Sequence, residues 1–144
     1  MTHYTITNYG FHHKEGINKQ QCLDQHLTGK HSKHDSVRWD RGSDIPEFHM
    51  SVKSAKFSLV AGGQLRGETM SEMLDDFFAR VASISFAYVT KDYKVYVMDA
   101  HEFREFLDTF GYFSYESQQN NGLRKIKAKS ESKAMIEWLQ ARVA

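Results

Sequence analysis

Residues 40–53 read Asp-Arg-Gly-Ser-Asp-Ile-Pro-Glu-Phe-His-Met-Ser-Val-Lys, and the second half of this stretch alternates polar with apolar side chains. This period of two predicts a β-strand over residues 47–54. Its core side would carry Phe48, Met50 and Val52. The opposite side would gather a carboxylate, an imidazole, a hydroxyl and an ammonium group, from Glu47, His49, Ser51 and Lys53.

The segments around this strand alternate between helical and extended patterns. Helices are predicted over residues 14–29, 70–82, 100–110 and 131–143, and further strands over residues 35–40, 56–61, 84–90, 93–98 and 123–128. The expected order is α-β-β-β-α-β-β-α-β-α. That order predicts an α/β (α+β) fold in which helices flank a mixed central β-sheet.

Capping and turn residues mark several of these boundaries. Thr69 or Ser71 is expected to cap the helix over residues 70–82, and Ser130 the last helix. Lys91-Asp92 is expected to join the strands over residues 84–90 and 93–98 as a hairpin.

Length and composition indicate one folded domain. The chain has 144 residues, of which 40% are hydrophobic and 26% charged, so it is too apolar for a disordered protein. No run approaches the roughly 18 consecutive apolar residues of a membrane helix, and the first residues lack a signal-peptide pattern. The single cysteine, Cys22, has no partner for an internal disulfide. These features predict a cytoplasmic protein.

Charge is distributed unevenly although the net charge is only +1. A basic segment near the C-terminus holds a single acid, Glu131, among five cations: Arg124, Lys125, Lys127, Lys129 and Lys133. A local basic patch is enough to bind phosphates on a nearly neutral protein. A solvated surface is the alternative interpretation.

The polar side of the strand over residues 47–54 carries groups that suit phosphodiester hydrolysis. Mg²⁺ is usually held by one or two carboxylates together with water and phosphate oxygens. Asp44 would bring a carboxylate to the edge that also carries Glu47. Lys53 would position or deprotonate the attacking water and offset negative charge. The alternative is an ordinary half-exposed strand preceded by an Asp44-Ile45-Pro46-Glu47 turn.

The run Asp44…Ser51-Val-Lys53, set within an α-β-β-β-α-β order, resembles the PD-(D/E)XK nuclease superfamily, which includes restriction enzymes and Holliday-junction resolvases. The resemblance spans about residues 14–90. It implies a restriction-endonuclease-like fold and a single domain over residues 1–144. A nuclease-like core would cover about residues 14–98, followed by a C-terminal α-β-α extension.

The resemblance also implies roles for individual residues. In this family an acid at one strand end is followed, on the next strand, by an acid, any residue and Lys, and these groups bind Mg²⁺. Asp44 would therefore be the principal metal ligand and Lys53 the water-positioning group. Ser51 stands where the second acid is expected and would be a secondary polar contact. Glu68, as in Ser-x-Lys restriction enzymes, or Glu47 would supply the missing carboxylate.

The expected function is a DNA endonuclease that uses Mg²⁺ or Mn²⁺, with RNA as a further substrate to consider. Sequence-independent phosphate contacts would come from Lys56, Arg66, Arg124, Lys125 and Lys127. A homodimer is plausible because cutting both strands requires two sites. Two alternatives remain: an inactive member of the same fold that binds nucleic acid or protein, and a small assembly protein that uses the Phe/Tyr-rich C-terminal half.

Two other groups of residues carry weaker signals. Seven of the eight histidines lie within the first 49 residues, but zinc sites usually combine such histidines with paired cysteines, so solvated loop histidines are favoured. Among the aromatic residues, Tyr112–Tyr115 are expected to be the most exposed because a Gln/Asn-rich loop follows them. Exposed aromatic rings of this kind can stack on nucleic-acid bases.

Overall fold

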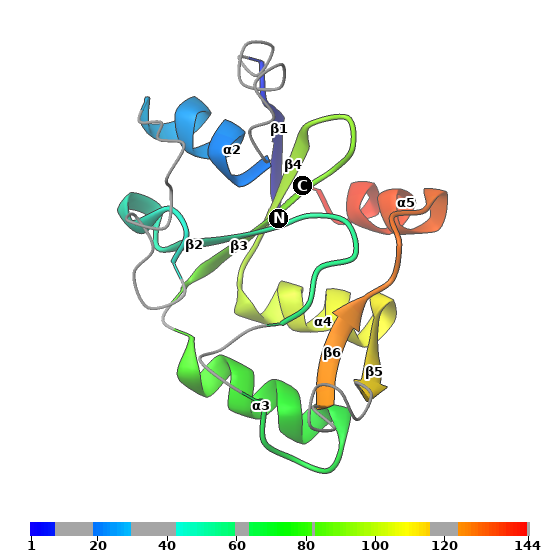
Figure 1. The fold of residues 1–144 in the computed structure, drawn as a ribbon. Helices are drawn as coiled ribbons and strands as arrows, with labels where there is room; N and C mark the ends of the chain where they lie inside the picture. Colours follow the sequence, from blue (N-terminus) through cyan, green and yellow to red (C-terminus); the bar gives the residue numbers. More distant parts are fainter. Residues whose placement is uncertain (8–18, 30–42, 60–63, 82, 116–123, 144) are drawn as a thin grey trace.

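Figure 1 shows the computed structural model of the chain, which describes residues 1–7, 19–29, 43–59, 64–81, 83–115 and 124–143. The strands are β1 (Thr2–Thr5), β2 (Met50–Lys53), β3 (Ser85–Val89), β4 (Lys94–Met98), β5 (Gly111–Tyr115) and β6 (Arg124–Ala128). The helices are α2 (Lys19–Thr28), α3 (Met70–Arg80), α4 (Ala100–Phe110) and α5 (Lys133–Ala141), and a 3-10 turn, η2, covers Pro46–Phe48. The fold is thus mixed α/β, as the sequence pattern predicts.

The main sheet has the strand order β1-β4-β3-β2. β1 and β3 each pair with β4 in antiparallel fashion, whereas β2 pairs with β3 in parallel. The sheet is therefore mixed, as expected. A separate antiparallel ribbon consists of β5 and β6.

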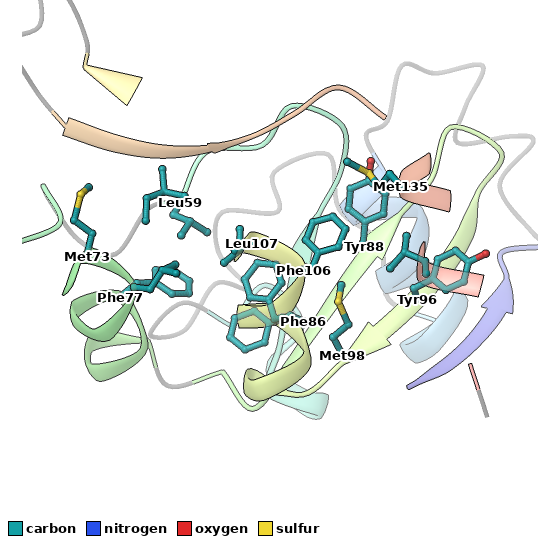
Figure 2. Close-up of a cluster of buried hydrophobic side chains, with 14 of the residues drawn as sticks. Leu59, Met73, Phe77, Phe86, Tyr88, Tyr96, Met98, Phe106, Leu107 and Met135 are labelled. Atoms are coloured by element: carbon teal, nitrogen blue, oxygen red, sulfur yellow. The ribbon is translucent and has the colours of Figure 1, made fainter. Parts of the chain in front are cut away.

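Side chains of β3 and β4 divide between the two faces of the main sheet, as strand geometry requires. On one face Phe86 and Tyr88 join a core with side chains of α3, α4 and α5, several of which are drawn in Figure 2. Aromatic rings dominate this core, and the Phe86 and Phe103 rings stack with centroids 4.4 Å apart. On the other face Ala87 and Val89 pack in a second cluster that includes Cys22 and Leu23 of α2.

The helix boundaries follow from capping side chains. The Thr69 hydroxyl accepts a hydrogen bond from the Glu72 backbone N–H at 3.1 Å, and the Glu72 carboxylate accepts the Thr69 N–H at 3.2 Å, so α3 begins with a capping box. The prediction that Thr69 caps this helix is confirmed. Ser130 as the cap of the last helix is wrong: Ser132 caps α5 by accepting the Met135 N–H.

Two predicted strands are shorter or absent. The strand over residues 47–54 begins only at Met50, because η2 precedes it and His49 takes a left-handed φ of 47°. The described part of residues 56–61 is not a strand of the sheet. Lys56, with φ 58°, turns the chain, and the following residues pair briefly with β6 through the Ser58–Lys127 bridge. The predicted strand over residues 35–40 lies outside the described residues.

The remaining elements divide into those that the pattern predicts and those that it misses. The hairpin at Lys91-Asp92 is confirmed, and Tyr93 closes it with φ 62°. The sequence pattern does not predict strands β1 and β5. In the structure β1 is an edge strand of the main sheet beside β4, and β5 pairs with β6. None of the helices in the described part of the chain is long and apolar enough to cross a membrane.

We expect Phe103→Ala to lower the free energy of unfolding by about 3–5 kcal/mol, because its ring is fully buried among five other aromatic rings. Urea unfolding followed by circular dichroism measures the change. Ile84→Ala is the matched control: its side chain is 66% exposed, and its effect should stay within about 0.5 kcal/mol. A loss below about 1 kcal/mol at Phe103 would contradict this account of the core.

Candidate active site

A tight turn folds residues 43–45 back along the start of β2. Ile45 and Met50 exchange backbone hydrogen bonds of 3.0 and 3.2 Å, and η2 together with the left-handed His49 closes the turn between them. Pro46 suits the first position of this turn because its φ is fixed and it needs no backbone donor. The turn therefore carries Asp44 to a position beside Ser51 and Val52.

The Asp44 carboxylate is tied to β2 through one of its oxygens. Oδ2 accepts the Val52 backbone N–H at 2.7 Å and lies 3.5 Å from the Ser51 hydroxyl, which donates to it. Ser51 is buried, with 3% of its surface exposed. Within the described residues both hydrogen bonds to Asp44 end on Oδ2, which leaves Oδ1 for another partner.

Lys53 stands two residues beyond Ser51 on the same side of β2. It pairs in register with Tyr88, and its Nζ lies 5.9 Å from the centroid of the Phe57 ring, at the edge of the aromatic core. Burial lowers the pKa of the Lys53 ammonium, and the nearby Asp44 charge partly opposes that shift. The Lys53 side chain thus lies on the core face of the sheet, and the Asp44 charge offsets only part of the cost of removing its ammonium group from water.

The electrostatics of Asp44 mirror those of Lys53. Burial raises the pKa of the Asp44 carboxyl, while the Val52 hydrogen bond, the Lys53 charge and the Ser51 hydroxyl each lower it. A carboxylate and an ammonium group that are both desolvated and that act on each other are typical of catalytic sites, although structural ion pairs also show such shifts.

The two proposed second carboxylates lie in different places. Glu68 is exposed at the start of α3, and its Oε2 lies 3.5 Å from Nη1 of Arg124 on β6. The Gly67 carbonyl also accepts a hydrogen bond from Arg124, and Figure 1 shows the start of α3 beside β6 and away from β2. Glu47 is exposed in η2, three residues from Asp44.

The structure therefore brings together Asp44, Ser51 and Lys53 and does not bring Glu68 to them. In the described part of the chain no group of three or more His, Cys, Asp or Glu side chains forms a ready metal site. The residues present still fit a hard cation such as Mg²⁺, which one or two carboxylates can hold. Asp44 would supply one carboxylate, and water and phosphate oxygens would complete the coordination shell.

The predicted phosphate-binding residues separate into two groups. Lys56 and Lys127 line one surface groove, and Lys125 lies on the same strand as Lys127. Arg124 is engaged by Glu68, and the Arg66 backbone N–H donates to Asp76 at 2.7 Å.

Sequence reasoning misses several contributors to these sites. Phe57 is expected to be a strand residue, yet it lies beneath Lys53 and anchors the segment after β2 in the core. Lys129 and Tyr112 line the groove with Lys56 and Lys127. The period-two spacing of Lys125, Lys127 and Lys129 is the signal that would have pointed to one lysine-bearing side of the strand.

Other sequence signals have little structural support or lie outside the described residues. Among the histidines, His26 stacks on Tyr4 with ring centroids 5.6 Å apart. His12, His13, His31 and His34 lie outside the described residues, as do Gly62 and Gly63. No family model, curated protein or solved structure matches the chain.

We expect the partly buried charges of Asp44 and Lys53 to be coupled in stability. Lys53→Met should lower the free energy of unfolding in the native background, because it leaves the desolvated Asp44 carboxylate without its cation. In the Asp44→Asn background the same change should raise stability, because it removes an ammonium group that has no remaining counter-charge. Urea unfolding with EDTA at neutral pH measures the four free energies.

The change in unfolding free energy of the double variant should differ from the sum of the two single changes by about 0.5–3 kcal/mol, as is usual for residues that interact directly. Asp44→Asn keeps an oxygen that accepts the Val52 N–H, so the turn is preserved. Effects that add within about 0.3 kcal/mol would show that the two charges do not interact in the folded protein.

Proposed function

We propose that this chain is a metal-dependent DNA endonuclease of the PD-(D/E)XK type. The observation that carries the proposal is the arrangement of Asp44, Ser51 and Lys53 on and beside β2. Their spacing in the sequence is that of the Asp…Ser-x-Lys motif, and both charged groups are partly removed from water. Removing such a pair from water costs free energy, and pairs with perturbed pKa values of this kind are common at catalytic sites.

The proposed chemistry assigns one task to each side chain. Asp44 would hold the cation, while the Ser51 hydroxyl and the Val52 N–H fix its carboxylate through Oδ2. Lys53, with its lowered pKa, positions the attacking water and accepts its proton in the neutral amine form. A bound Mg²⁺ supplies Lewis-acid stabilisation of the phosphoryl oxygens.

Glu47 is the better supported second carboxylate. It lies in the turn whose ends, Ile45 and Met50, are hydrogen-bonded to each other, so it belongs to the same rigid unit as Asp44. Glu68 lies instead beside Arg124 of β6, away from β2 (Figure 1). We therefore propose Asp44 and Glu47 as metal ligands, with Mn²⁺ able to replace Mg²⁺.

DNA is the proposed substrate because lysines gather near this site, and a homodimer would allow both strands of a duplex to be cut. A second function, binding nucleic acid without cutting it, is favoured by one observation. The described residues place a single carboxylate, that of Asp44, in hydrogen-bonding contact with the Ser51-Val-Lys53 segment. Cleavage and binding assays separate the two functions.

We expect the wild-type protein to cleave plasmid or branched DNA with Mg²⁺ or Mn²⁺. Lys53→Ala should slow cleavage by about 10²–10⁴-fold, the range that a general base contributes, and Asp44→Ala should abolish it. Lys91→Ala is the matched control, since this lysine is exposed in the turn between β3 and β4 and should leave the rate unchanged. Gel assays with circular dichroism of each variant measure the outcome.

The cleavage rate should also rise with pH through the lowered pKa of Lys53, because the neutral amine accepts the proton. Lys53→Arg keeps the charge but loses that rise, since arginine stays protonated. DNA binding without cleavage, at any pH and with either metal, would select the binding function instead.

We expect Mn²⁺ affinity to discriminate between the two carboxylates. Asp44→Asn should weaken binding at least tenfold, about the lower limit seen when a metal site loses a supporting group. Glu47→Gln should weaken it by a smaller factor, and Glu68→Gln should leave it unchanged because Glu68 pairs with Arg124. Isothermal titration calorimetry gives the affinities. A larger loss for Glu68→Gln than for Glu47→Gln would reverse the assignment.

A further inference from the structure

A groove of about 450 Å³ lies where the β5–β6 ribbon meets the segment after β2. Its lining residues are three lysines, a tyrosine and two small residues, namely Lys56, Lys127, Lys129, Tyr112, Ala128 and Ser130. Within the described residues, no acidic side chain lines this groove. A concave surface that combines cations with an aromatic ring suits a ligand with phosphates and flat bases.

The register of the ribbon explains how these side chains meet. Tyr112 is the cross-strand partner of Lys127, and Ser114 is the partner of Lys125, so the four side chains share one face of the ribbon. Successive lysines on this face are separated by two residues, or about 6.8 Å. That distance is about twice the axial spacing of phosphates along one nucleic-acid strand.

The aromatic ring on this face is available for stacking. Tyr112 is 42% exposed, although it lies directly across from Lys127 in the ribbon. Phe113 is similarly exposed, at 43%, but alternation places it on the opposite face of the ribbon. Of these two exposed rings, it is therefore Tyr112 that shares a surface with the lysines.

Phe57 links the segment that bears Lys53 to the strand that lines the groove. Lys53 lies over the Phe57 ring, and the Phe57 carbonyl accepts the Ala128 backbone N–H at 2.8 Å. Lys56 follows Lys53 by three residues, and its φ of 58° turns the chain between the two. A nucleic-acid strand bound in the groove would therefore lie next to the segment that bears Lys53.

We propose that this groove binds a single-stranded segment of nucleic acid, with a base stacked on Tyr112 and phosphates on Lys56, Lys127 and Lys129. An unpaired base is required because bases inside a duplex have both faces covered by their neighbours. Delivery of this strand to Lys53 rests on the proposed nuclease function, whereas binding itself does not. The substrate class is then DNA with a single-stranded part, such as a branch, flap or gap.

The test measures binding without cleavage. The 144-residue Lys53→Ala protein in EDTA is titrated into fluorescein-labelled oligo-dT of about 20 nucleotides, and into a duplex of the same length, with anisotropy as the readout. We expect the single strand to bind more tightly. Tyr112→Ala should weaken that binding by about 5- to 150-fold, the range for loss of one stacked base, while Tyr112→Phe retains it.

Two controls separate stacking from general damage and from charge. Phe113→Ala removes an equally exposed ring from the other face of the ribbon and should leave the affinity unchanged. Replacing Lys56 and Lys127 by Gln should weaken binding and reduce the slope of log affinity against log salt by about 0.7 for each phosphate that is no longer neutralised. Circular dichroism checks that each variant folds.

Tighter binding of the duplex, or equal losses for Tyr112→Ala and Phe113→Ala, would overturn the proposal. The result is independent of the nuclease assay. If Tyr112→Ala alone loses binding while the wild type never cleaves, the groove stands and the nuclease function fails. If the wild type cleaves but Tyr112→Ala binds and cleaves normally, the nuclease function stands and the groove fails.

Discussion

The parallel pairing of β2 with β3 is the constraint on which the rest of the structure depends. Parallel neighbours require a crossover, so the chain must leave the sheet after Lys53 and return before Ser85, and α3 lies within that crossover. The helix packs on the face that carries Phe86 and Tyr88. Because Ser51 and Lys53 pair in register with these two residues, their polar groups face an aromatic core, and Lys53 is desolvated as a result.

Elements with both a strong pattern and a local signal were predictable from the sequence. α3 and α4 combine an apolar side with a capping box, and the hairpin at Lys91-Asp92 lies between two β-rich runs. β1 could not be recognised in the same way, because its four residues, Thr-His-Tyr-Thr, are largely polar and it forms an edge strand. Phe57 and Leu59 are apolar because they pack in the core. Their alternation with polar residues has the same spacing as in a β-strand, so the sequence alone predicts a strand there.

The candidate site was predictable only where its geometry is local. Asp44, Ser51 and Lys53 are close in the sequence, and one turn followed by one strand is enough to bring them together. The place of Glu68 depends instead on Arg124, a residue of a strand much further along the chain, and no local pattern reports such a contact. The groove likewise depends on a contact between segments far apart in the sequence. Lys56 and Tyr112 line it together because the segment after β2 pairs with β6 at the Ser58–Lys127 bridge.

The environment of Lys53 joins the two proposed activities in one segment. The short stretch from Lys53 to Leu59 leaves the sheet, places Phe57 in the core and hydrogen-bonds to β6 on both sides of Ser58. Packing of Phe57 thereby fixes Lys53 on one side and the lysine groove on the other. A chain under pressure for stability alone would gain by replacing both members of the desolvated Asp44–Lys53 pair with apolar residues of similar size, whereas the loss of one member leaves the other charge uncompensated. The position of Lys53 at this junction, beside a desolvated carboxylate, is therefore the feature that supports the proposed chemistry on a bound nucleic-acid strand.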